Sequence, residues 1–194
     1  MRTIETEVFT FKELSEEAKQ KAIEDCRNSE GYMNYDWYSS LYEEYEELAN
    51  NLGFEGVKFY FSGFWSQGDG AMFEYKSLND NLRLNFIASL DLSPMRKNWI
   101  INNTAVSGSG RHRGHYYHEK CCEHNIYFEV DNSYIDGSSL FCGWLESYSD
   151  AFDEYVIDKY EDLCRDFYKA LENEYDYQNT DEVISDFLES NGYE

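Results

Sequence analysis

One apolar stripe near the end of the chain constrains the fold more than any other feature. Between Leu145 and Leu171 large apolar side chains recur every three or four residues, which is the spacing of one face of an α-helix. The stripe consists of Leu145, Tyr148, Phe152, Tyr155, Val156, Tyr160, Leu163, Cys164, Phe167 and Leu171. Asp and Glu occupy eight of the 17 positions between them. The pattern predicts a helix of about 27 residues, roughly 40 Å long at 1.5 Å per residue.

Helical spacing also occurs near the start of the chain and at its end. Residues 11–27 place apolar side chains three to four apart, with Ser15 as the candidate N-cap. Residues 35–52 repeat leucine and aromatic side chains in the same way. A short final helix is predicted to open at Thr180 or Asp181.

The middle of the chain has the composition of β-strands. Its apolar runs are rich in aromatic and β-branched residues or alternate with polar ones, and glycines separate them. The candidate strands are 57–64, 71–75, 82–90, 99–106, 113–120 and 124–130. Their lengths are typical of strands. We therefore expect a central antiparallel sheet of about five or six strands.

Together these elements predict the α+β class in a single domain over residues 1–194. Residues 1–52 form a helical part with an N-terminal helix pair, 57–130 form the sheet, and 138–192 form acidic C-terminal helices.

The formal charge of −23 follows the same division. The net charge is −8 over residues 1–50, −2 over 51–136 and −13 over 137–194. A charge of this sign repels nucleic acid and anionic lipid, so we expect neither as a direct ligand. No apolar run is long enough to span a bilayer, and residues 1–10 do not resemble a secretion signal. Five cysteines at irregular spacing indicate no disulfide framework, and a cytoplasmic location fits best.

Rows of carboxylates on the expected helices are the candidate binding residues. They are Glu43, Glu47, Asp150, Asp153, Glu154, Asp158, Glu161 and Asp162. Such rows imitate the potential of a nucleic-acid backbone toward a basic cleft, and nearby tyrosines supply interface area. The predicted partner is a basic protein. The competing interpretation, that the charge only keeps the chain soluble, stays open because net charge by itself does not define a function. The oligomeric state also stays open.

A glycine-rich cluster over residues 62–71 has Ser66, Gln67, Gly68, Asp69 and Gly70 at its centre. Phosphate-binding loops lead from a strand into a helix. This cluster leads instead into a strand-like run and contains no Lys. We interpret it as a hairpin turn with Asp69–Gly70 as the turn dipeptide.

All four histidines lie between residues 112 and 124, next to Cys121 and Cys122. Zinc binds imidazole and thiolate ligands, but the spacing matches no zinc finger or ribbon. His115 and His118 are the weak metal candidates, and a strand would place them on opposite faces. We expect a half-exposed hairpin with no metal and no other cofactor. No catalytic motif singles out a catalytic residue.

Four stretches resemble a widespread family of phage and prophage proteins whose members are often labelled antitoxins of toxin–antitoxin stability systems. They are residues 11–23, 36–38, 59–73 and 114–119, and the most specific is Ser-Gly-Phe-Trp-Ser-Gln-Gly-Asp-Gly-Ala at 62–71. The resemblance spans residues 9–130 in outline and stops before the acidic helices. It implies a phage-encoded antitoxin or counter-defence protein acting against a host toxin or defence protein, for example a DNA ADP-ribosyltransferase toxin. It brings no catalytic residues with it.

Three hypotheses follow. The preferred one is a non-enzymatic inhibitor that binds a basic toxin or defence protein acting on nucleic acid. The alternative is an enzyme or small-ligand sponge that uses the Gly-rich turn and the His/Cys hairpin. The third is an accessory phage protein whose charge serves solubility alone.

Overall fold

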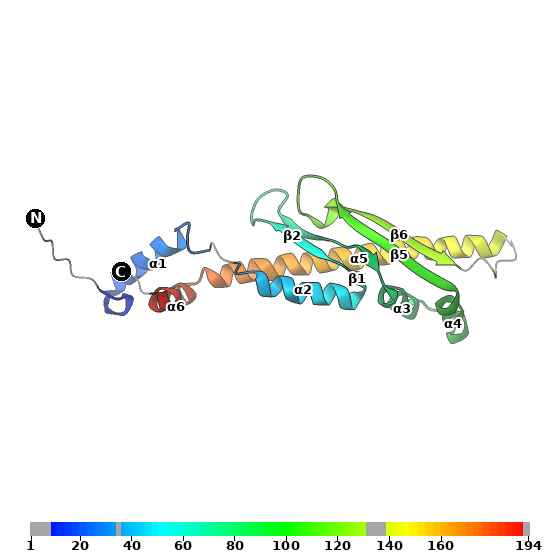
Figure 1. Ribbon diagram of the computed structural model, residues 1–194, viewed down its shortest axis with the longest axis horizontal. Helices are drawn as coiled ribbons and strands as arrows, with labels where there is room; N and C mark the ends of the chain where they lie inside the picture. Colours follow the sequence, from blue (N-terminus) through cyan, green and yellow to red (C-terminus); the bar gives the residue numbers. More distant parts are fainter. Residues whose placement is uncertain (1–8, 34–35, 131–138, 192–194) are drawn as a thin grey trace, which may run out of the picture. The chain divides into compact units, whose positions relative to one another are not determined.

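The computed structural model describes residues 9–33, 36–130 and 139–191 (Figure 1). The chain divides into two compact units. Unit 1 contains residues 1–39 and 171–194, and unit 2 contains residues 40–170. The prediction of a single domain over 1–194 stays a prediction.

Unit 1 is built from helices. They are η1 (Phe11–Glu13), α1 (Glu16–Arg27), the end of α5 (Ser139–Gln178) and α6 (Asp181–Asn191). The side chain of Ser15 accepts a hydrogen bond from the backbone N–H of Ala18, so Ser15 is the N-cap of α1 as predicted. Thr180 accepts one from the backbone N–H of Val183, and the predicted start of the final helix is confirmed.

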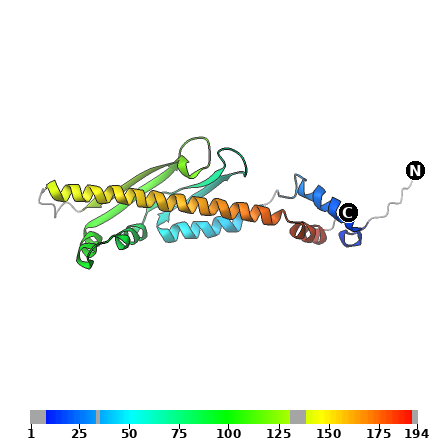
Figure 2. The same ribbon diagram turned by 180° about the vertical axis from the view of Figure 1, so that it is seen from behind.

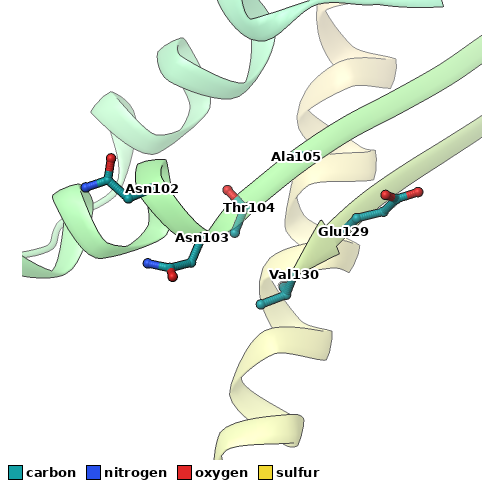
Figure 3. Close-up of a pocket in the computed structure, with 6 residues that line it drawn as sticks. All are labelled: Asn102, Asn103, Thr104, Ala105, Glu129 and Val130. Atoms are coloured by element: carbon teal, nitrogen blue, oxygen red, sulfur yellow. The ribbon is translucent and has the colours of Figure 1, made fainter. Parts of the chain in front are cut away.

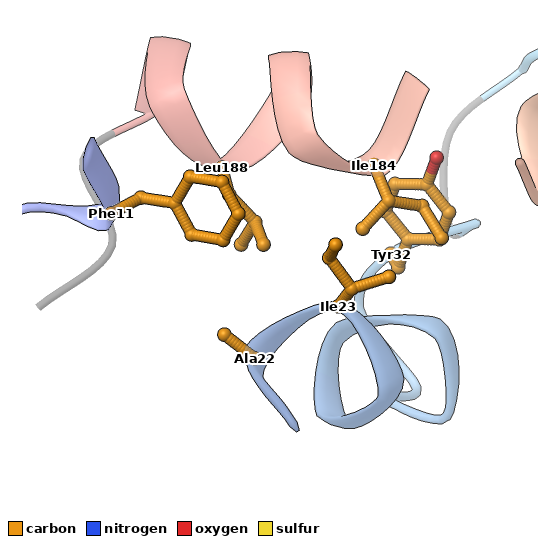
Figure 4. Packing of buried hydrophobic residues seen from close by; sticks show 6 residues of the cluster. All are labelled: Phe11, Ala22, Ile23, Tyr32, Ile184 and Leu188. Carbon is orange, nitrogen blue, oxygen red and sulfur yellow. The ribbon is translucent and has the colours of Figure 1, made fainter. Parts of the chain in front are cut away.

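A small apolar cluster holds α1 and α6 together (Figure 4). Its buried members are Phe11, Ala22, Ile23, Tyr32, Ile184 and Leu188. Polar contacts surround it. Arg27 donates to the backbone oxygen of Asn179 at 3.2 Å and pairs with Asp181, and the Tyr32 hydroxyl donates to the oxygen of Gln178.

Unit 2 combines helices with three strand pairs. Its helical elements are α2 (Ser39–Leu52), α3 (Asp80–Ser89), α4 (Pro94–Asn103), η2 (Glu119–Cys121) and α5 up to residue 170. Its antiparallel pairs are β1 (Phe54–Glu55) with β4 (Ser77–Leu78), β2 (Lys58–Ser62) with β3 (Gly70–Glu74), and β5 (Thr104–His112) with β6 (Cys122–Val130). The strands β1 to β4 form a first hairpin, and β5 with β6 form a second. A single bridge between Tyr75 and Gly110 joins the first hairpin to the second.

The core of unit 2 lies between α5 and these hairpins, and the stripe predicted from the sequence forms one side of it. Its buried members in unit 2 are Phe152, Val156, Tyr160, Leu163, Cys164 and Phe167. Leu171, the first residue of α5 in unit 1, is also buried. Tyr148 and Tyr155 are half-buried, and the side chain of Leu145 lies outside the described part. The hydroxyl of Tyr160 donates to the backbone oxygen of Phe73 at 2.9 Å, which ties α5 to β3. The helix has 40 residues, longer than the stripe alone indicated.

The α+β class is confirmed, but the expected central sheet of five or six strands is wrong. The described strands form three separate two-stranded sheets. Both predicted N-terminal helices exist, although the second begins at Ser39 and not at 35, and the C-terminal helices α5 and α6 are confirmed.

Of residues 82–90, which alternate like a strand, 82–89 belong to helix α3 and Leu90 is its C-cap. The side chain of Asn79 caps this helix by accepting a hydrogen bond from Asn81 N–H. Leu82 and Phe86, four residues apart, are both buried. The alternating leucines resemble a strand, but the burial of Leu82 and Phe86 follows the period of a helix.

Two other strand predictions also fail. Most of 99–106 lies in α4, which starts at Pro94 behind the N-cap Ser93, and the strand begins only at Thr104. Residues 113–120 form a loop and the start of η2 between β5 and β6. The predictions over 57–64, 71–75 and 124–130 match β2, β3 and β6.

Within the described ranges, every helix is too short or too polar to cross a lipid bilayer.

Candidate functional site

An acidic ridge follows the exposed side of α5. It consists of Asp150, Glu154, Asp158 and Asp162, which are all exposed and four residues apart. This spacing separates successive carboxylates by about 6 Å along the helix. In unit 2, α5 lies across the strands with α2 and α3 beside it (Figure 2). The ridge therefore presents aligned carboxylates to solvent while the opposite face of the helix is buried.

Two predicted binding residues are not part of the open ridge. Glu161 is paired with cations, and Asp153 is partly buried. Glu161 is only 14% exposed and pairs with Lys120 and Arg165. Burial raises its pKa, but hydrogen bonds from Lys120 and Arg165 outweigh this and leave the pKa below its usual value. Arg165 also pairs with Asp162 at 2.6 Å, at the end of the ridge. Three carboxylates, Asp150, Glu154 and Asp158, have no ion pair within the described residues.

Asp153 points inward from α5. Its Oδ1 atom is buried and has no hydrogen-bond partner among the described atoms. Burial, followed by the nearby charge of Asp150, raises the pKa of this carboxyl above its ordinary value. Asp153 is therefore a poor contact for an external partner.

Glu43 and Glu47 are exposed on α2, as the helix pattern predicted. The same helix packs on α5 through Tyr42 and Tyr45, whose rings lie 5.2 and 5.0 Å from that of Phe167. Burial and then the charges of Asp166 and Glu44 raise the pKa of Tyr45. Exposed carboxylates thus occur on both of these packed helices.

The Gly-rich cluster is a loop that connects β2 to β3, and the carboxylate of Asp69 closes it. Asp69 accepts a hydrogen bond from the N–H of Ser66 at 2.6 Å and donates its own N–H to the oxygen of Ser66. The hairpin turn is confirmed, but its dipeptide is not Asp69–Gly70, because Gly70 already pairs with Ser62 in the ladder. The positive φ angles fall at Trp65 and Gly68.

This loop packs against the loop between β5 and β6. A Cβ at Gly68 would lie 2.6 Å from the ring of Tyr116, and one at Gly70 would lie 3.0 Å from the ring of His118. Gln67 is exposed beside them. The two segments singled out separately by the sequence therefore form one surface.

Trp65 stands out on this surface, and sequence reasoning missed it. Its side chain is 71% exposed, and its φ of +71° is rare for a bulky residue. Tryptophan is enriched among the interface residues that contribute most to binding. Its position inside the most specific motif was the signal that could have identified it.

The weak metal candidates do not meet. His115 is exposed, whereas Nδ1 of His118 accepts a hydrogen bond from Lys120 N–H at 3.2 Å as the cap of η2. In the part of the chain that the structure describes, no three His, Cys, Asp or Glu side chains gather as a metal ion requires.

His124 and Cys122 lie inside the hairpin junction. Nδ1 of His124 is 3.1 Å from the hydroxyl of Tyr75 and 3.9 Å from Sγ of Cys122. Burial raises the pKa of the Cys122 thiol to about 11 and lowers the pKa of His124. Both groups are neutral at pH 7, so the pair lacks the thiolate that nucleophilic catalysis needs.

A small polar pocket of about 260 Å³ lies where α4 runs into β5 (Figure 3). Asn102, Asn103 and Thr104 line one side, and Glu129 and Val130 of β6 line the other. Val130 is the last described residue before 131–138. Another hollow, of about 300 Å³, lies in unit 1 between α1 and α6, and its lining includes Ile23, Glu16 and Glu182.

The model of the family described as "Domain of unknown function (DUF8835)" matches residues 37–181. The match contains all of unit 2 and the end of α5, and it leaves α1 outside. No curated protein and no solved structure matches the chain.

Proposed function

The chain belongs to the DUF8835 family, and we propose that it is a non-enzymatic inhibitor that binds a basic protein through the acidic ridge. The partner is a toxin or defence protein of the host that acts on nucleic acid, and the inhibitor is a phage-encoded antitoxin working in the host cytoplasm. The resemblance of residues 62–71 to phage proteins labelled antitoxins supports the biological setting.

The observation that carries the proposal is the row of unpaired carboxylates on α5. Asp150, Glu154 and Asp158 are exposed, aligned and without ion pairs among the described residues. Charged surfaces of this kind steer an oppositely charged partner and fix its orientation. Glu43 and Glu47 extend the negative surface over α2.

The charge density of the ridge indicates which kind of partner it suits. Duplex DNA carries a charge about every 1.7 Å of its axis, whereas one helical row carries one about every 6 Å. The ridge alone is sparser than the duplex it would imitate. It suits a partner with spaced Lys and Arg side chains, such as the rim of a nucleic-acid-binding cleft.

The test is a comparative pull-down from lysate of the host at about 0.1 M and about 0.5 M salt, a range over which exposed charge pairs weaken. The ridge variant is Asp150→Asn, Glu154→Gln and Asp158→Asn. The matched control neutralises three exposed carboxylates of α1 by Glu17→Gln, Glu24→Gln and Asp25→Asn.

We expect one stoichiometric basic, nucleic-acid-acting protein on the wild-type chain and on the control. The ridge variant and the higher salt concentration should both reduce its capture. Capture that is equal for both variants, or that persists unchanged at high salt, contradicts binding through the ridge.

The alternative function, an enzyme or small-ligand sponge, draws support from the contact between the two loops, which unites Gly68 with Tyr116 and Gly70 with His118. Its metal-dependent form predicts stoichiometric zinc on the purified chain. That zinc should disappear when His115 and His118 are replaced by alanine.

A further inference from the structure

A cavity of about 360 Å³ lies where the two hairpins of unit 2 meet. Three cationic side chains line it: Lys58 of β2, Lys76 between β3 and β4, and Arg111 of β5. Glu74 is its one acidic lining residue. The cavity therefore carries a net positive lining in a chain whose formal charge is −23.

Hydrogen bonds at a break in the first hairpin fix the backbone around the cavity. The ladder is interrupted between the pairs Glu55–Ser77 and Lys58–Glu74. At the break, Tyr75 exchanges two hydrogen bonds with Gly110 of β5, at 3.1 and 3.0 Å. These bonds join the two hairpins and hold residues from both at the cavity.

A glycine at the break makes room for one of the cations. Gly56 has a φ of +62°, and a Cβ there would lie 2.9 Å from Cδ of Lys76. A larger residue at 56 would be strained and would displace the stem of Lys76. The placement of Lys76 beside the cavity thus depends on this backbone conformation.

Within the described residues, no carboxylate oxygen lies within 4.0 Å of the Lys58 ammonium. Glu74 lies directly opposite Lys58 in the ladder. However, its two oxygens accept hydrogen bonds from the N–H of His112 at 3.0 Å and the hydroxyl of Tyr60 at 2.9 Å. These bonds hold the pKa of Glu74 below its ordinary value. The ammonium of Lys58 lies instead over the Tyr60 ring, 4.8 Å from its centroid.

The carboxylate that lies opposite Arg111 is also engaged by another group. Glu123 lies opposite it across β5 and β6, but the ion pair of Glu123 is with Arg113, at 3.7 Å. Within the described residues, Lys58, Lys76 and Arg111 have no carboxylate within 4.0 Å. Three exposed cations that line one cavity and have no ion pair within the described residues indicate a site for an external anion.

The chemistry favours phosphate. A guanidinium fork and two ammonium groups match the several oxygens and the double charge of a phosphate group better than a single carboxylate. The cavity volume is at the lower end of the range for small-molecule sites. A long polyanion is disfavoured, since the negative field of the whole chain repels it.

We propose that the cavity formed by Lys58, Lys76 and Arg111 binds the phosphate groups of a small molecule. The site shares no residue with the acidic ridge, so this proposal is independent of the proposed inhibition.

Isothermal titration of the full chain with inorganic pyrophosphate at about 0.05 M salt tests this proposal, because low ionic strength preserves exposed charge interactions. We expect saturable binding at one site per chain. The double variant Lys76→Gln and Arg111→Gln should weaken it at least tenfold, and Lys58→Gln should weaken it in the same direction. Circular dichroism verifies that each variant is folded.

The matched control, Lys21→Gln and Arg96→Gln, removes the same charge from exposed positions that have no ion pair within the described residues. It should bind pyrophosphate like the wild type. The absence of saturable binding overturns the proposal, and so does equal weakening in the control. Succinate that binds as tightly as pyrophosphate overturns the assignment to phosphate.

Discussion

Two carboxylates on α5, Asp158 and Asp153, differ in their exposure to solvent. Asp158 is exposed on the ridge, whereas Oδ1 of Asp153 is buried without a hydrogen-bond partner among the described atoms. Burial without hydrogen bonds disfavours the charged form of a carboxyl group because the charge loses its hydration. The two residues therefore have different effects on stability, although both were predicted as binding residues.

Asp153→Asn should stabilise the chain at pH 7. The native pKa of Asp153 is raised, so the folded state binds more protons than the unfolded state between the unfolded pKa of about 3.9 and the higher native value. Wild-type stability falls as the pH rises through that window, and the asparagine removes this loss. Urea unfolding at pH 7 and at about pH 4 measures the difference, which should shrink at the lower pH. Asp158→Asn is the control, and an equal gain there contradicts the prediction.

At the scale of elements, α1 and α6 depend on each other. Neither helix has a large core of its own, and Ile23 of α1 and Ile184 of α6 are buried in the same cluster. Arg27 adds a polar tie from α1 to Asp181. Short helices are only marginally stable without such packing. Removing apolar contacts from one helix should therefore destabilise both.

Ile184→Ala should destabilise unit 1 by about 2–5 kcal/mol, the usual cost of removing a large aliphatic side chain from a core. Hydrogen exchange should show reduced protection in both α1 and α6. Leu48→Ala, at a side chain that is 41% exposed on α2, is the control and should leave that protection unchanged. Protection that persists in α1 would mean that the shared cluster does not hold this helix.

For the whole molecule, the charge of −23 is the dominant property. Like charges on a compact surface repel one another and reduce the stability of the folded state. The few cations do not offset this repulsion, and several of them, such as Lys120 and Arg165, are engaged with individual carboxylates.

Added sodium chloride should therefore raise the Tm of the chain at pH 7. The Debye length falls from about 10 Å at 0.1 M to about 3 Å at 1 M, which screens the repulsion. Calorimetry over this range measures the effect. At the isoelectric point, about 4.4, the increase should largely vanish. A Tm that is independent of salt at pH 7 contradicts the role of self-repulsion.

The sequence alone determined the helical segments outside the middle of the chain, because helical period and caps such as Ser15 are local properties. It also located the two loops that prove to be in contact. The tertiary structure decided that residues 82–89 are helical, that Asp153 and Glu161 turn away from the open ridge, and that Trp65 is exposed. It also decided that Lys58, Lys76 and Arg111 meet at one cavity. Each of these depends on contacts between residues far apart in the chain, which periodicity and composition do not encode.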